Sequence, residues 1–172
     1  MRFLTNSECV TWCTSRGYPA GNVPGYTVPK AARQPEGFSF AEFKPPTDSG
    51  QKVWFSRFLF GLIDPTPEVL LWLGNWGVWG SSEHMPLFTR FRQAFGEVRP
   101  LIEVPGHLAS AEDADDAISI LATALLFVWD CHVITSSGRD VIYLSHDEYS
   151  WFASRDPSTT QSMEQRIGDA LK

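Results

Sequence analysis

The clearest indication of the fold class is the sequence DCHVITSSGRDVIYL, residues 130–144. Residues 131–135 and 140–144 are rich in β-branched and aromatic side chains, which favour strands. Between them, Ser-Ser-Gly-Arg at 136–139 is typical of a tight turn. The pattern predicts a β-hairpin, and a hairpin makes its two strands antiparallel.

Helix and strand signals surround this hairpin. Capping signals and apolar spacing predict helices over 5–16, 51–62, 81–96 and 111–128, and alternating apolar residues predict strands over 37–44, 68–79 and 101–104. After the hairpin, Ser145-x-x-Glu148 has the form of a capping box and predicts a short helix through Phe152.

Together these elements predict a single domain of the α+β (or α/β) class. We expect a mixed sheet of four to five strands with helices packed over it and the hairpin towards the C-terminus. The globular domain is expected over residues 1–155, and the polar residues 156–172 are expected to form a tail with a loosely held helix.

Composition and charge exclude several partners. The chain has 172 residues, of which 43% are apolar and 20% charged, as is ordinary for one globular domain. Its formal net charge at pH 7 is −6. Nucleic acids and anionic membrane surfaces attract basic proteins, so we expect neither as a partner. The longest nearly apolar run, residues 117–129, is shorter than the about 20 residues that span a bilayer.

Two features predict a cytoplasmic protein. Residues 1–8 lack the apolar core of a secretory signal. The three cysteines, Cys9, Cys13 and Cys131, cannot form a fully paired disulfide set, as expected in a reducing compartment.

Two motifs with histidine invite a catalytic interpretation. In Ser-His-Asp-Glu, residues 145–148, His146 is a candidate general base, but the capping box explains the motif more simply, because adjacent side chains at a helix start diverge. In Asp-Cys-His, residues 130–132, Cys131 is a candidate nucleophile. It would need His107 or His146 as its base, since the adjacent His132 faces the other side of a strand. A buried structural cysteine is the simpler interpretation.

No cofactor or metal is expected. Cys9 and Cys13 share one helical face, but no nearby Cys or His would complete a zinc site. Glycine-rich phosphate-binding motifs do not occur in the sequence, so nucleotide binding has no support. The acidic residues near position 113 lack the spacing of a calcium loop.

Two groups of residues predict a protein partner instead. The turn after the aromatic strand has arginines close by in the sequence, and an exposed Trp beside arginine is typical of an interaction hot spot. The candidate residues of this turn are Trp79, Glu83 and His84. Carboxylates at the start of the helix predicted over 111–128 complement the helix dipole, and they also present an acidic patch to a basic protein. These carboxylates are Glu112, Asp113, Asp115 and Asp116.

Four segments carry a resemblance: WGVWGSSE at 76–83, PGH at 105–107, DC at 130–131 and SHDE at 145–148. In these segments the chain resembles a group of small uncharacterised bacterial proteins, which brings no assigned activity with it. In size, acidity, aromatic content and lack of a catalytic signature, the chain is also similar in type to immunity proteins of bacterial toxin systems. That second likeness transfers no residue roles.

We therefore expect a non-enzymatic cytoplasmic binding protein, most concretely an immunity-type inhibitor of a basic bacterial toxin. Its negative charge would steer it towards a cationic partner. One alternative is a small hydrolase or transferase that uses Cys131 with His107 or His146. Another is a structural or oligomeric protein without chemistry.

Overall fold

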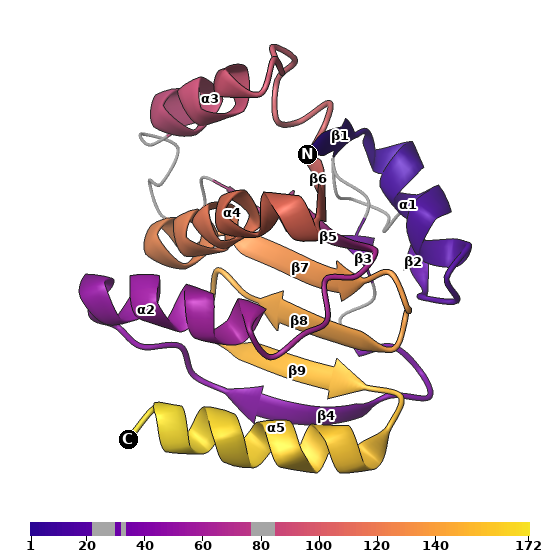
Figure 1. Ribbon diagram of the computed structural model, residues 1–172, viewed down its shortest axis with the longest axis vertical. Helices are drawn as coiled ribbons and strands as arrows, with labels where there is room; N and C mark the ends of the chain where they lie inside the picture. The colour runs from indigo at the N-terminus through magenta and orange to yellow at the C-terminus, as the bar shows by residue number, and fades with distance from the viewer. Residues whose placement is uncertain (22–29, 32–33, 77–84) are drawn as a thin grey trace.

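The structure, a computed structural model, describes residues 1–21, 30–31, 34–76 and 85–172. Its centre is an open sheet of seven strands in the order β1-β6-β5-β7-β8-β9-β4 (Figure 1). The strands are β1 (Arg2–Leu4), β4 (Ser39–Phe43), β5 (Glu68–Gly74), β6 (Gly106–Ser110), β7 (Asp130–Thr135), β8 (Asp140–Leu144) and β9 (Ser150–Ser154). Two further short strands, β2 (Ala20–Gly21) and β3 (Lys30–Ala31), form a separate antiparallel pair.

The predicted α+β domain is confirmed, but the expected mixed sheet of four to five strands is wrong. Within the described residues the sheet has seven strands, and all neighbouring strands are antiparallel. The hairpin predicted over 130–144 is present as β7 and β8. The additional strands arise where the sequence predicted something else or nothing, at β1, β6 and β9.

Strand β9 replaces the helix predicted from Ser145 to Phe152. The Ser145 backbone N–H donates to the carbonyl of Tyr149 at 3.0 Å, which closes a turn. Glu148 has a φ of 56°, in the left-handed region that a helix start does not use. Strand pairing with both β8 and β4 then buries Trp151 and Phe152 on opposite faces of the sheet. These long-range contacts outweigh the local capping signal.

The strand predicted over 101–104 is also wrong, and β6 begins at Gly106 instead. Residues 100–104 form a turn, in which the N–H groups of Glu103 and Val104 donate to the carbonyl of Pro100. The guanidinium of Arg92 donates to the Val104 carbonyl at 2.9 Å, so that carbonyl is not available to a sheet partner. Strand β5 ends at Gly74, so the strand predicted over 68–79 is wrong at Asn75 and Trp76, and its residues 77–79 lie outside the described residues.

Five α-helices accompany the sheet in the described ranges: α1 (Asn6–Thr14), α2 (Ser49–Phe60), α3 (Met85–Ala94), α4 (Ala114–Phe127) and α5 (Pro157–Ala170). Thr5 and Glu8 form the predicted capping box of α1, and Asp48 caps α2. Ser110 and Asp113 form a second capping box, which opens a 3₁₀ turn (Ala111–Asp113) that leads into α4. The expected start of α3 at Ser81 or Ser82 lies outside the described residues.

The two faces of the sheet bury separate cores. Residues of α2 and α4 pack against one face, where Leu71, Val133 and Phe152 project. Helix α1 packs against the other face, which carries a row of large side chains from neighbouring strands: Trp72, His132, Tyr143 and Trp151. All six residues of β7 are buried, as expected for a central strand covered on both faces.

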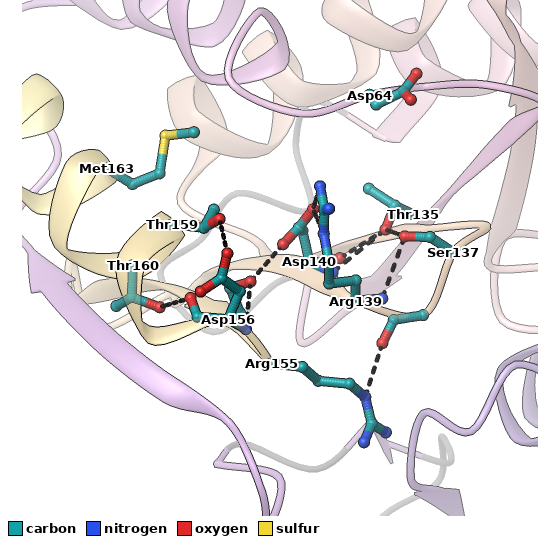
Figure 2. A network of polar contacts seen from close by, with 12 residues as sticks. Asp64, Thr135, Ser137, Arg139, Asp140, Arg155, Asp156, Thr159, Thr160 and Met163 are labelled. Carbon is teal, nitrogen blue, oxygen red and sulfur yellow. Dashed lines mark hydrogen bonds and ion pairs between the residues drawn. The ribbon is translucent and has the colours of Figure 1, made fainter.

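Hydrogen bonds connect the turn between β7 and β8 to the end of β9, as Figure 2 shows. The carboxylate of Asp140 accepts from Arg139 Nε at 2.9 Å and from Ser154 Oγ at 2.6 Å. Arg155 Nε donates to the Gly138 carbonyl at 3.3 Å. Helix α5 follows directly, capped by Asp156, and its Ile167 belongs to the same core as α2 and α4.

None of the helices in the described ranges combines the length and the apolar character that crossing a bilayer requires.

Candidate functional site

Cys131 lies fully buried on the face of the sheet that α2 and α4 cover. Its Sγ donates to the carbonyl of His132 at 3.9 Å. Burial raises the pKa of the Cys131 thiol, and the negative charge of Asp130 acts in the same direction. Because the thiolate is the nucleophilic form, a thiol held protonated in the core is poorly suited to catalysis.

His107 lies two strands away on the same face. It pairs with Leu71 of β5, whereas Cys131 pairs with Leu73, so their Cα atoms are separated by two strand spacings and two residues, roughly 12 Å. Burial and the nearby positive charge of Arg92 lower the pKa of His107 to about 3. Its Nδ1 lies 3.1 Å from the Pro105 carbonyl oxygen. The structure therefore places His107 as a neutral residue in the core, away from Cys131.

His146 is joined to a carboxylate that the sequence did not assign to it. The register of β7 and β8 pairs Cys131 with Leu144, which brings Asp130 beside the residues that follow β8. The Asp130 carboxylate accepts from the His146 backbone N–H at 2.8 Å and lies 2.7 Å from His146 Nδ1. Asn75, just after β5, donates to its other oxygen. We call Asn75, Asp130, His146 and Asp147 the His146 site.

Backbone strain gathers at the same end of the sheet. Within the described residues, positive φ values outside glycine occur at Asn75 (46°), Val128 (56°) and Glu148 (56°). Asn75 follows β5, Val128 lies two residues before Asp130, and Glu148 lies in the turn after His146. The left-handed conformation costs a β-branched residue such as Val128 about 1–2 kcal/mol. Such strain is typical of functional sites.

The geometry of the His146 site suits acid–base chemistry. A carboxylate can only accept, so Nδ1 is the ring nitrogen that donates its proton to Asp130. The His146 side chain is 14% exposed, and its Nε2 lies 3.4 Å from Asp147 Oδ1. The sequence predicted that these two side chains diverge, and a turn in place of the expected helix brings them together. Within the described residues, no group of three or more His, Cys, Asp or Glu side chains could hold a metal.

The predicted partner-binding residues have different outcomes. Trp79, Glu83 and His84 lie outside the described residues. Asp113 serves the capping box before α4, and Asp115 lies 3.2 Å from Arg57 of α2 in an exposed ion pair. Glu112 is exposed and Asp116 is half-buried. These acids contribute negative charge on the surface, but their defined contacts are structural.

Sequence reasoning missed an exposed apolar surface on α3. Leu87 is 66% exposed and Phe95 36%, and Phe91 between them is half-buried. Leu87 and Phe91 lie one turn apart on α3, and Phe95 follows directly after its last residue, with the Phe91 and Phe95 ring centres 5.2 Å apart. The following loop exposes Val98 (77%) and Ile102 (52%). We call these five residues the α3 surface.

Buried Arg92 connects α3 to the loop that follows it. It lies on the inner side of α3 with Phe88, whose ring contacts Trp129 at 5.3 Å. Its guanidinium donates to the carbonyls of Arg99 (3.1 Å) and Val104 (2.9 Å). The loop of residues 97–104 is thereby held against α3.

No protein-family model, curated protein or solved structure matches the chain. The resemblance noted from the sequence stays a prediction.

Proposed function

We propose that the chain is a non-enzymatic binding protein that holds a basic protein on its α3 surface, as an immunity-type inhibitor holds a toxin. The observation that carries this proposal is the concentration of exposed apolar side chains. Six large hydrophobic residues are exposed in the described ranges, and four of them belong to the α3 surface. Exposed apolar patches of this kind mark interaction sites.

Charge supports a basic partner. The formal net charge of −6 would steer a cationic protein towards the molecule, while apolar contacts at the α3 surface would supply affinity. We place this activity in the cytoplasm. The three cysteines are free and buried, as suits a reducing compartment.

Capture experiments with matched variants test the proposal. Tagged wild type, Leu87→Asp and Val53→Asp are used to capture proteins from host lysate at low and high salt. Val53 is the control because it is 50% exposed on α2, away from the α3 surface. We expect one basic protein in stoichiometric amount, bound more weakly at high salt because screening removes the steering. Leu87→Asp should reduce its capture at least about tenfold, and Val53→Asp should leave it unchanged.

Two outcomes contradict the proposal. Equal capture by both variants would show that the partner binds elsewhere. A homo-oligomer in light scattering that dissociates on Leu87→Asp would show that the α3 surface serves self-association, as the structural alternative holds.

Acid–base chemistry at His146 is a second candidate function, favoured by the 2.7 Å contact between its Nδ1 and the buried carboxylate of Asp130. The alternative that uses Cys131 stays a prediction, and the raised pKa of its thiol counts against it. A hydrolase screen with two variants separates them. Activity lost in His146→Gln and kept in Cys131→Ala supports a histidine mechanism, and loss in Cys131→Ala supports the thiol.

A further inference from the structure

A groove lies where three segments distant in sequence meet. The linker after β4, the start of α2 and the end of α5 lie on the same side of the molecule, at the left in Figure 1. The groove between them has a volume of about 440 Å³, and its lining includes Lys44, Pro45, Pro46, Trp54, Leu171 and Lys172. We call it the Trp54 groove.

Trp54 offers a flat apolar surface in this groove. Its side chain is 52% exposed, although Trp is a residue that folded proteins usually bury in large part. The indole stacks on the ring of Phe58, one turn further along α2, with ring centres 5.4 Å apart and planes 14° apart. This contact orients the indole before any ligand arrives, which lowers the entropic cost of binding.

Positive charge gathers around the same groove. The chain has four lysines, at 30, 44, 52 and 172, and two of them line the groove. Lys52 lines a small adjoining cavity that shares Pro45 and Pro46 with it. Lys172 donates to Asp169 at 2.7 Å, whereas Lys44 forms no ion pair with any residue the structure describes. The residues that line the groove include two lysines and no aspartate or glutamate, and Glu148 lines the adjoining cavity with Lys52.

We propose that the Trp54 groove binds a small planar organic anion. The planar ring stacks against Trp54 and contacts the prolines, and the carboxylate or phosphate of the ligand lies at the ammonium group of Lys44. The groove volume lies within the range of small-molecule sites, about 300–1,000 Å³. A helix or a folded partner would need a longer apolar surface, such as the one on α3. This proposal uses none of the α3 residues, so it stands or fails separately from the proposed function.

The test uses two probes that share this chemistry but differ in source, adenosine monophosphate and indole-3-acetate. Binding is followed by ¹H–¹⁵N NMR through the indole N–H signal of Trp54, which Trp54→Phe assigns. We expect a saturable shift of that signal with one or both probes at up to millimolar concentration. Adenosine has the planar ring without the anion, and inorganic phosphate has the anion without the ring. Each should bind at least about tenfold more weakly than adenosine monophosphate.

Two variants of equal charge change provide the control. Lys44→Gln removes a cation that lines the groove, and Arg57→Gln removes one that lies on α2, pairs with Asp115 and is outside the lining. Lys44→Gln should raise the dissociation constant about tenfold and Arg57→Gln should not. The proposal is overturned if neither probe gives a saturable shift, if inorganic phosphate binds as well as the nucleotide, or if the two variants weaken binding equally.

Discussion

Acidification should destabilise the protein through His107. This histidine is buried beside the rings of Phe3 and Phe88, and burial together with the Arg92 charge lowers its pKa to about 3. In the folded protein it stays neutral as the pH falls from 7 to 5. In the unfolded chain it takes up a proton below its ordinary value of 6.5. The unfolded state therefore binds more protons in the window between about 3 and 6.5, and stability is lost as the pH falls through it.

The magnitude follows from the unfolded state. At pH 5 the folded histidine is still neutral, so the free energy of unfolding falls in proportion to the difference between pH 5 and the pKa of 6.5 in the unfolded chain. That difference is about 1.5 pH units. Each pH unit corresponds to about 1.4 kcal/mol, so His107 contributes about 2 kcal/mol of lost stability between pH 7 and pH 5.

Urea unfolding at pH 7 and pH 5 measures this difference. His107→Leu has no titrating group at this position. Between pH 7 and pH 5 its free energy of unfolding should therefore fall by about 2 kcal/mol less than the free energy of unfolding of the wild type falls. Phe3→Leu is the control: it removes a ring that contacts His107 at 5.4 Å but no proton-binding group, and should lose the same free energy at both pH values. If His107→Leu and wild type show the same pH dependence, His107 is not a neutral core residue.

Three further predictions concern the structure around the sites. Gly138→Ala should lower the free energy of unfolding, measured in urea, by about 2 kcal/mol or more, because φ is 64° and the new Cβ would lie 2.1 Å from the backbone oxygen of Arg16. Gly168→Ala is the matched control in α5: the site has open space around it, so the free energy of unfolding should rise by about 0.5–1 kcal/mol. Arg92→Met leaves two backbone carbonyls without their charged donor and should cost about 3 kcal/mol in the same assay. Asp130→Asn removes the carboxylate that holds the proton on Nδ1 of His146, and the ¹⁵N shifts of that ring should move towards the other tautomer, while unchanged shifts would contradict the orienting role.

Local patterns predicted the elements whose signals were complete within a few residues. The hairpin of β7 and β8 and the capping box at Thr5 both formed where expected. The same type of capping box at Ser145 failed, because pairing of β9 with strands on both sides decided its structure. A short-range signal of about 1 kcal/mol cannot compete with burial of residues such as Trp151.

The candidate sites could be predicted only in part from the sequence. Asp130 and His146 each stood in a motif that the sequence singled out, and the predicted hairpin register would have placed them together. The α3 surface was visible as the spacing of Leu87, Phe91 and Phe95, but periodicity does not tell which side of a helix is buried. In the structure the buried side of α3 is the one that carries Arg92, which donates to backbone carbonyls. A sequence pattern does not indicate which arginine will be buried by such backbone contacts.

Site-specific photo-crosslinking tests whether a basic protein binds the α3 surface in the cell. A photoreactive amino acid replaces Leu87 on the α3 surface or, as a control, Val53 on α2, and both variants are irradiated in living host cells. We expect one abundant adduct with a basic protein from position 87 and none from position 53. No adduct from position 87, or the same adduct from both positions, would show that the α3 surface is not where a partner binds.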